Sequence, residues 1–193
     1  MSAVLLFWME PMFAKMILPL LGGAPSVWNT CIVFYQTLLL LGYIYAHATT
    51  KWFGLRWQVI LHVLLLLLVI MTLPVGVAKG WVPPLSSNPV LWLLLFLLIS
   101  VGLPFFTLSA TAPLLQKWFA LTVHPSAKDP YFLYSASNLG SLIGLLGYPL
   151  LIEAYLPLPL QAKSWSVSYI LLAGMISACA IIALNFHASG WGV

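Results

Sequence analysis

Long apolar stretches separated by short polar turns constrain the fold of this sequence more than any other feature. A helix that crosses the hydrocarbon core of a bilayer needs about 20 predominantly apolar residues. The sequence predicts six such spans, over about 3–21, 26–47, 57–78, 89–111, 131–152 and 165–186. The predicted fold is therefore an all-α, polytopic transmembrane bundle that forms a single domain over residues 1–193.

The charge composition supports the same fold class. Charged residues make up 5% of the chain and hydrophobic residues 63%, whereas a soluble domain typically has about a quarter of its residues charged. So few charges cannot cover a surface that faces water, but they suit a surface that faces lipid. The net charge is +4, and its seven basic residues are scattered. We therefore predict no nucleic-acid partner, because that function needs a clustered basic face.

The fourth apolar stretch is longer than one crossing requires. It runs over about 89–119, which exceeds a hydrocarbon core of about 30 Å at the rise of a straight helix. Proline removes a backbone donor and kinks or ends helices. We predict that the fourth span is kinked or broken at Pro104 and Pro113, followed by a short interfacial piece over 114–119.

Basic residues near span ends predict the orientation, because they stay on the cytoplasmic side. Four lie after the second and fourth spans and two lie in the other loops, namely Lys51, Arg56, Lys117 and Lys128 against Lys79 and Lys163. Both termini are therefore predicted to be cytoplasmic. The first 20 residues lack a basic region ahead of the apolar run, so no cleavable signal peptide is expected.

Two charged residues fall inside the first predicted span. A charge at the bilayer centre costs at least about 2.5–3.5 kcal/mol on insertion scales, so such residues usually face the protein interior or water. Glu10 and Lys15 are separated by about 140° on a regular helix, which is a poor geometry for pairing. One interpretation is a proton or cation site. The other is that Glu10 lies near the cytoplasmic surface or meets donors such as Asn29 or Gln36.

Three amides also fall inside predicted spans, namely Asn29, Gln36 and Asn138. Buried amides need partners, and their ordinary use in membranes is hydrogen bonding between helices. The alternative is a role in substrate binding. With Glu10 and Lys15 they make up the candidate polar intramembrane site.

A stripe of small residues marks the fifth predicted span. Ala136, Gly140 and Gly144 recur every four residues, and the two glycines form a GxxxG pair. Such a stripe lets another helix approach closely. Packing within this chain is the preferred interpretation, and contact with a second chain is the alternative.

Histidines and cysteines predict no metal site. His62 is the histidine that lies well inside a span; we expect it to be a hydrogen-bonded packing residue, with ligation of haem or a pigment as the alternative. Cys31 and Cys179 lie in apolar runs and are expected to act as small hydrophobic residues. We predict no cofactor and expect bound lipid.

The motifs of known enzyme classes are missing from the sequence. It contains no glycine-rich phosphate loop, no HExxH and no nucleophile elbow. Its acidic residues total three, which gives little material for general acid–base chemistry. Catalysis by this chain is therefore not expected.

Several segments of the chain carry a family resemblance. They are EPMFAK (10–15), LPLLGGAP (18–25), VWNT (27–30), GYIYAH (42–47), VGLPFF (101–106), SATAPLL (109–115), DPYFLY (129–134) and SNLG (137–140). Together these segments resemble the membrane part of bacterial spermidine-synthase-like membrane proteins, also described as fused major-facilitator/spermidine synthase proteins. The resemblance implies a location in the bacterial inner membrane.

In that family a soluble domain with a Rossmann-like fold typically follows the membrane part. The sequence ends at Val193, just past the sixth predicted span, so we expect no counterpart of that domain here. No residues for aminopropyl or methyl transfer can be assigned by the resemblance. The major-facilitator fold has twelve spans in two halves, and six spans are at most one half.

Three functions remain open from the sequence. The first is an accessory or scaffold subunit that packs within a larger membrane complex, with lipid and other membrane protein subunits as partners. The second is a transporter or half-transporter that uses Glu10 and Lys15 in an oligomer. The third is a membrane anchor for a separate spermidine-synthase-like enzyme.

Overall fold

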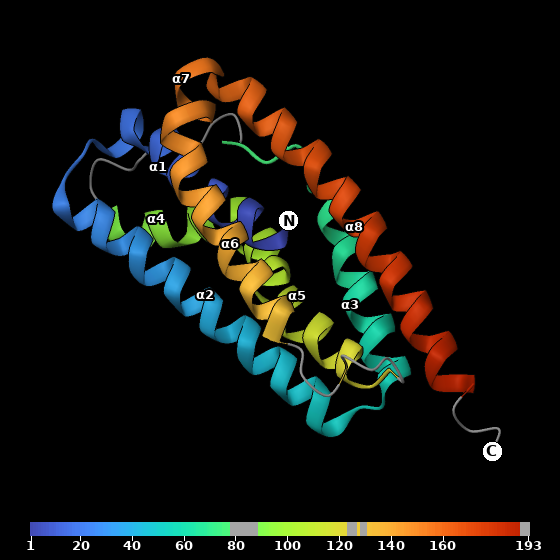
Figure 1. Cartoon of the computed structure of the whole chain (residues 1–193). Helices are drawn as coiled ribbons and strands as arrows, with labels where there is room; N and C mark the ends of the chain where they lie inside the picture. The colour runs from blue at the N-terminus through green and yellow to red at the C-terminus, as the bar shows by residue number, and fades with distance from the viewer. Residues whose placement is uncertain (78–88, 123–126, 128–130, 190–193) are drawn as a thin grey trace.

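The computed structural model describes residues 1–77, 89–122, 127 and 131–189, with side chains through Asn185. The regular elements in this part of the chain are helical (Figure 1). In chain order they are α1 (Ser2–Leu21), α2 (Pro25–Trp52), α3 (Leu55–Ile70), α4 (Pro89–Leu97), η1 (Leu98–Gly102), α5 (Leu103–Ala120), α6 (Tyr131–Gly147), η3 (Tyr148–Ile152), α7 (Glu153–Tyr155) and α8 (Leu158–Ser189). The elements η1 and η3 are π-helical turns. They connect α4 to α5 and α6 to α7 without a gap.

Five helical segments are long and apolar enough to cross a membrane. They are Ser2–Leu21, Pro25–Trp52, Pro89–Ala120, Tyr131–Tyr155 and Leu158–Asn185. A further helix, α3, is apolar but has 16 residues, which span about 24 Å at 1.5 Å per residue. By length and composition the chain is a multi-span integral membrane protein. The all-α prediction is confirmed, and the third span is shorter than predicted.

Three predicted helix ends are wrong, each for a local reason. The sixth span was expected to begin at 165, but α8 begins at Leu158, because proline is tolerated in the first turn of a helix. The third span was expected over 57–78, but α3 ends at Ile70, where the hydroxyl of Thr72 donates to the carbonyl of Val69 at 2.7 Å. The second was expected to end at 47, but α2 continues to Trp52. The hydroxyl of Thr50 donates to the carbonyl of Ala46 at 2.7 Å, so this polar turn fits inside a helix.

The fourth span is continuous rather than broken. Helix α5 passes through Pro113 to Ala120, so the predicted break at Pro113 and the separate piece over 114–119 are wrong. The π-helical turn η1 ends at Gly102, two residues before Pro104. A π turn shifts the backbone hydrogen bonding by one residue, which accommodates a proline that cannot donate. The irregular backbone near Pro104 therefore lies at a position that the sequence predicted.

Helix α5 lies at the centre of the bundle and packs against α1, α2, α3 and α8. The largest fully buried side chains include Phe13, Phe105, Trp118, Trp165 and Tyr169. Two hydrogen bonds join α8 to distant helices. Trp165 Nε1 donates to the carbonyl of Leu5 at 2.9 Å, and the hydroxyl of Tyr169 donates to the carbonyl of Leu66 at 3.4 Å.

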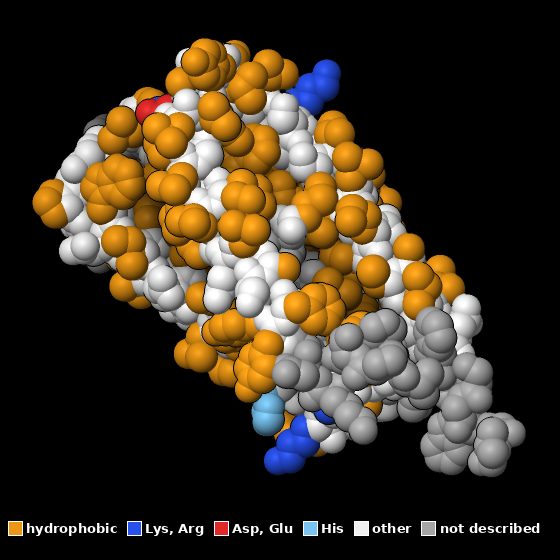
Figure 2. All heavy atoms as spheres, in the orientation of Figure 1, with side chains coloured by type: hydrophobic (Ala, Val, Ile, Leu, Met, Phe, Trp, Pro, Cys, Tyr) orange, Lys and Arg blue, Asp and Glu red, His pale blue; other side chains and the backbone are white. Residues whose placement is uncertain are grey.

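The outer surface of the bundle is apolar. On the face shown in Figure 2, hydrophobic side chains cover the helices, and the visible charged side chains lie near the two ends. Helix α6 illustrates the pattern, because its buried residues are Gly140 and Gly144, whereas Leu142, Leu145 and Leu146 are exposed. Such a surface suits the lipid environment predicted from composition.

The small residues of α6 face α1 of the same chain. A Cβ atom added at Gly144 would lie 3.0 Å from Phe7 Cβ and 3.1 Å from the carbonyl oxygen of Val4, and one at Gly140 would lie 3.5 Å from Ala3 Cβ. Ala136 lines a small cavity beside the N-terminal residues. Gly140 and Gly144 therefore allow α6 to pack closely against α1 of the same chain.

Helices α2 and α5 make an even closer approach at Gly42. A Cβ atom there would overlap Ser109 Oγ and would lie 2.9 Å from Ser109 Cβ and 3.1 Å from the backbone nitrogen of Ala110. The hydroxyl of Ser109 donates to the carbonyl of Phe106 at 2.8 Å. The two helices can pack at this separation because position 42 has no side chain.

We expect Gly42→Ala to destabilise the protein by about 1–3 kcal/mol, because the added methyl group overpacks the α2–α5 contact. Thermal unfolding of purified protein in mild detergent measures the effect. Gly174→Ala is the matched control, since a Cβ atom there meets nothing within 4 Å. Equal melting temperatures for the two variants would contradict the packing described here.

Candidate intramembrane polar site

A cavity of about 420 Å³ lies between α1, α2 and the segment from α6 to α7. Its volume falls within the range of about 300–1,000 Å³ that is usual for small-molecule pockets. The polar residues in its wall are Glu10 from α1, Tyr35 and Gln36 from α2, Tyr148 from η3 and Glu153 from α7. We call it the Glu10 cavity.

Glu10 itself has no hydrogen-bonding or ion-pair partner among the described residues. Its side chain is half-buried, and it shares a helix face with Ala14, which lines the same cavity one turn further along α1. Asn29, which was considered as a partner, is exposed near the start of α2. Gln36 lines the cavity but makes no bond to Glu10 in the structure. The carboxylate therefore lines the cavity without a partner in the part of the chain that the structure describes.

Lys15 forms an ion pair with Glu153 of α7 rather than with Glu10. The two side chains are 39% and 38% exposed, and pairs of this accessibility contribute about 0–1 kcal/mol to stability. Glu153 could not be selected from the sequence, because its position at the end of a span is also that of an interfacial residue. The rarity of acidic residues could have pointed to Glu153, since the chain has three of them. Two of the three line the same cavity.

The two tyrosines in the cavity wall differ in how their hydroxyls are used. The hydroxyl of Tyr148 donates to Gln161 Oε1 at 3.0 Å, and Gln161 Nε2 in turn donates to the carbonyl of Leu156 at 2.7 Å. Tyr35 is 5% exposed, and its hydroxyl has no partner among the described residues. A buried hydroxyl without a partner costs about 1–3 kcal/mol. Tyr35 therefore lines the cavity and carries a buried hydroxyl that no described residue satisfies.

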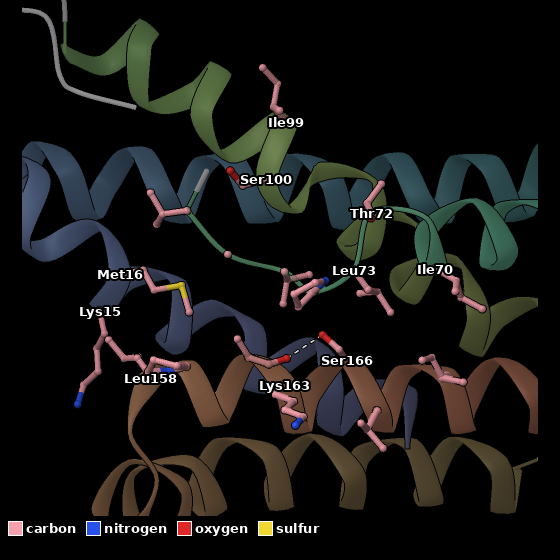
Figure 3. Close-up of a pocket in the computed structure, with 18 of the residues that line it drawn as sticks. Lys15, Met16, Ile70, Thr72, Leu73, Ile99, Ser100, Leu158, Lys163 and Ser166 are labelled. Carbon is pink, nitrogen blue, oxygen red and sulfur yellow. Dashed lines mark hydrogen bonds between the residues drawn. The ribbon is translucent and has the colours of Figure 1, made fainter. Parts of the chain in front are cut away.

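A second and larger cavity lies on the other side of α1. It has a volume of about 1340 Å³, and its wall is mostly apolar. In Figure 3, Lys15, Leu158 and Lys163 lie along one wall, with Ile99 and Thr72 across from them. Lys15 lines this larger cavity, whereas its partner Glu153 lines the Glu10 cavity. The ion pair thus connects the walls of the two cavities.

Asn138 belongs to a different part of the molecule. It lines a third cavity of about 340 Å³, whose wall also includes Ser109, Gln116 and Ser141. The predicted polar site is therefore divided. Glu10 and Gln36 lie together and Lys15 adjoins them through Glu153, while Asn138 lies apart.

His62 is enclosed in the core. It is 0% exposed, and its Nε2 lies 3.1 Å from Thr111 Oγ1. The rings of Tyr45 and Trp118 have centroids 6.2 and 6.0 Å from its own. These contacts are those of a packing residue. In the part of the chain that the structure describes, no group of three or more His, Cys, Asp or Glu side chains could hold a metal ion.

The two cysteines have different surroundings. Cys31 is buried and lines the Glu10 cavity, as expected for a small hydrophobic residue. Cys179 is exposed on α8, since an apolar stretch of a membrane helix has one side that faces lipid.

No family model, curated protein or solved structure matches this chain.

We expect Lys15→Glu to lower stability by about 1 kcal/mol, because it replaces a partly exposed ion pair with a like-charge contact. Adding Glu153→Lys should restore most of the loss. Thermal unfolding of the single and double variants measures this coupling. Lys163→Glu changes the net charge equally at a lysine for which no ion pair is described, and it should have little effect. If the double variant is no more stable than Lys15→Glu alone, the pairing described here is wrong.

Proposed function

We propose that the protein binds a small solute in the Glu10 cavity and moves it across the membrane, as a transporter or half-transporter. The observation that carries the proposal is the carboxylate of Glu10, which lines a cavity and has no partner among the described residues. An ionisable group at membrane depth is costly and usually lies on a path for ions or substrates. A group with a purely structural role would instead be expected to meet a donor within the protein.

The backbone beside Glu10 supports the same use. Pro11 lies inside α1 and has no N–H, so the carbonyl of Phe7 lacks its usual helical donor. Phe7 lines the Glu10 cavity. Transport sites are often formed where a helix loses regular backbone hydrogen bonds, because the freed carbonyls can hold a ligand.

The two cavities beside α1 support a route for the solute. They lie on opposite sides of α1, and the Lys15–Glu153 pair connects their walls. Because such a pair contributes little to stability, it can open and close at small cost. In our proposal this pair closes the passage between the two cavities.

We expect Glu10→Gln to abolish transport while the protein remains folded, because glutamine keeps the size of the side chain but not its charge. The assay is uptake of a panel of radiolabelled solutes into proteoliposomes. Lys51→Gln is the control and should retain uptake, because Lys51 is exposed at the end of α2 and lines neither cavity. Uptake by Glu10→Gln at the rate of the unchanged protein would contradict a role for Glu10.

An accessory or scaffold subunit is the second candidate, and helix α6 favours it. The buried residues of α6 are two glycines, and its outer face is apolar, which suits a partner subunit as well as lipid. Gentle extraction, native gel separation and mass spectrometry distinguish the two functions. A stoichiometric large complex together with absence of uptake would favour the accessory role. The anchor function rests on the family resemblance alone and predicts a copurifying cytosolic transferase.

We also propose that both termini face the cytoplasm. The order of the helices places Lys51, Arg56 and Lys117 at one end of the bundle. At the opposite end, Lys163 is accompanied by Lys15, which Glu153 neutralises. This asymmetry follows the rule that basic residues stay inside. The predicted contributions of Lys79 and Lys128 fall outside the described residues.

Fusions at two positions test this orientation. Green fluorescent protein attached to the C-terminus should fluoresce, and alkaline phosphatase attached there should be inactive. Phosphatase inserted after Pro157, between α7 and α8, should be active because that turn lies at the other end of the bundle. The reverse pattern would place the termini outside the cytoplasm.

A further inference from the structure

With both of its carboxylates ionised, the Glu10 cavity has one negative charge that no described residue neutralises. Its wall contains two carboxylates, Glu10 and Glu153, and Lys15 forms an ion pair with the second. In surroundings of low dielectric constant an unpaired charge is costly, and a ligand of opposite charge removes that cost. An anionic ligand would add repulsion, and a ligand with two positive charges would remain half-neutralised. The charge balance therefore favours a ligand with a single positive charge.

The walls of the cavity also have an aromatic character. Trp28 and Tyr35 from α2 and Tyr148 from η3 all line it. The ring of Tyr35 is held by Phe105, with centroids 4.9 Å apart. Aromatic faces attract cations, tryptophan most strongly, and sets of such rings bind quaternary ammonium groups. Apolar side chains such as Ile32 and Leu145 complete the wall and suit alkyl substituents.

The carboxylates are too few for an inorganic cation of high charge, because the cavity has two and Lys15 pairs with one of them. The hydroxyl of Tyr35 and the carboxylate of Glu10 have no partners among the described residues, and the carbonyl of Phe7 lacks its usual donor. The hydroxyl of Tyr148 already donates to Gln161. Calcium needs six to eight oxygen ligands, and magnesium keeps near-octahedral geometry. A volume of about 420 Å³ instead has room for a cation with several carbon substituents.

We propose that the solute of the Glu10 cavity is an organic monocation with apolar substituents, bound by the carboxylate of Glu10 and by the rings of Trp28, Tyr35 and Tyr148. The proposal rests on the function proposed above, in that it assigns the ligand class of the same cavity. Glu10 supplies the charge, the rings supply the cation–π contacts, and the free hydroxyl of Tyr35 accepts a hydrogen bond where the cation carries an N–H group.

Tetraethylammonium is the probe for the binding test. Its equilibrium binding to the full chain in nanodiscs is measured by scintillation proximity. We expect binding by the unchanged protein, at least about tenfold weaker binding by Glu10→Gln, and weaker binding by Trp28→Leu. Trp52→Leu is the matched control, because Trp52 is 72% exposed and lies at the other end of α2. It should bind as the unchanged protein does.

A labelling experiment tests the sign of the charge without any ligand. A single cysteine is introduced as Ala14→Cys, in a background with Cys31→Ala and Cys179→Ala, because Ala14 lines the cavity one turn from Glu10. Cationic and anionic methanethiosulfonates of similar size are compared. The cationic reagent should react faster, and Glu10→Gln should lower the ratio of the two rates by about tenfold, which corresponds to about 1.4 kcal/mol.

Two results would overturn the assigned ligand class. One is a folded protein that does not bind tetraethylammonium, and the other is binding and labelling ratios that Glu10→Gln leaves unchanged. Different results would contradict the proposed transport. Binding of tetraethylammonium without uptake into proteoliposomes would support the ligand class and contradict transport. Glu10-dependent uptake of a neutral or anionic solute would support transport and overturn the ligand class.

Discussion

The need to pair backbone polar groups within the chain governs this structure, because hydrocarbon offers no hydrogen bonds. Helices meet that need, and threonine hydroxyls near helix ends bond to carbonyls of the preceding turn, as in Thr50 to Ala46. Lipid also removes the hydrophobic force between helices, so close contact must hold them together. Gly42 and Gly144 provide that contact for α2 with α5 and for α6 with α1.

The same constraint explains which parts of the fold could be predicted from sequence. Apolar stretches identify membrane helices because lipid selects for them, so the existence of each helix could be predicted, whereas several of its ends could not. Proline was a less reliable guide. At Pro104 a π-helical turn precedes the proline, whereas α5 passes through Pro113 without a break. A membrane helix tolerates proline when its surroundings satisfy the freed carbonyl, and those surroundings are not visible in a local sequence pattern.

The candidate site, too, could be predicted from the sequence only in part. Glu10 could be selected because a carboxylate inside a span is rare and costly. The pairing of Lys15 with Glu153 could not be predicted, because it joins α1 to a segment almost 140 residues later in the sequence. The role of Tyr35 depends on what its hydroxyl does not contact, and only the assembled bundle shows this. Asn138 has the right chemistry, but the fold places it in another cavity.

The contacts of α1 have a consequence for how the chain matures during synthesis. This helix packs mainly against α5, α6 and α8, and the indole of Trp165 closes the contact by bonding to the carbonyl of Leu5 across 160 positions of sequence. Helix α1 therefore lacks part of its packing until α8, which is synthesised later, has inserted. Before α6 and α7 are synthesised, Glu10 has no enclosing wall from these helices, so a helix with a charged residue enters the membrane ahead of the segments that shield it.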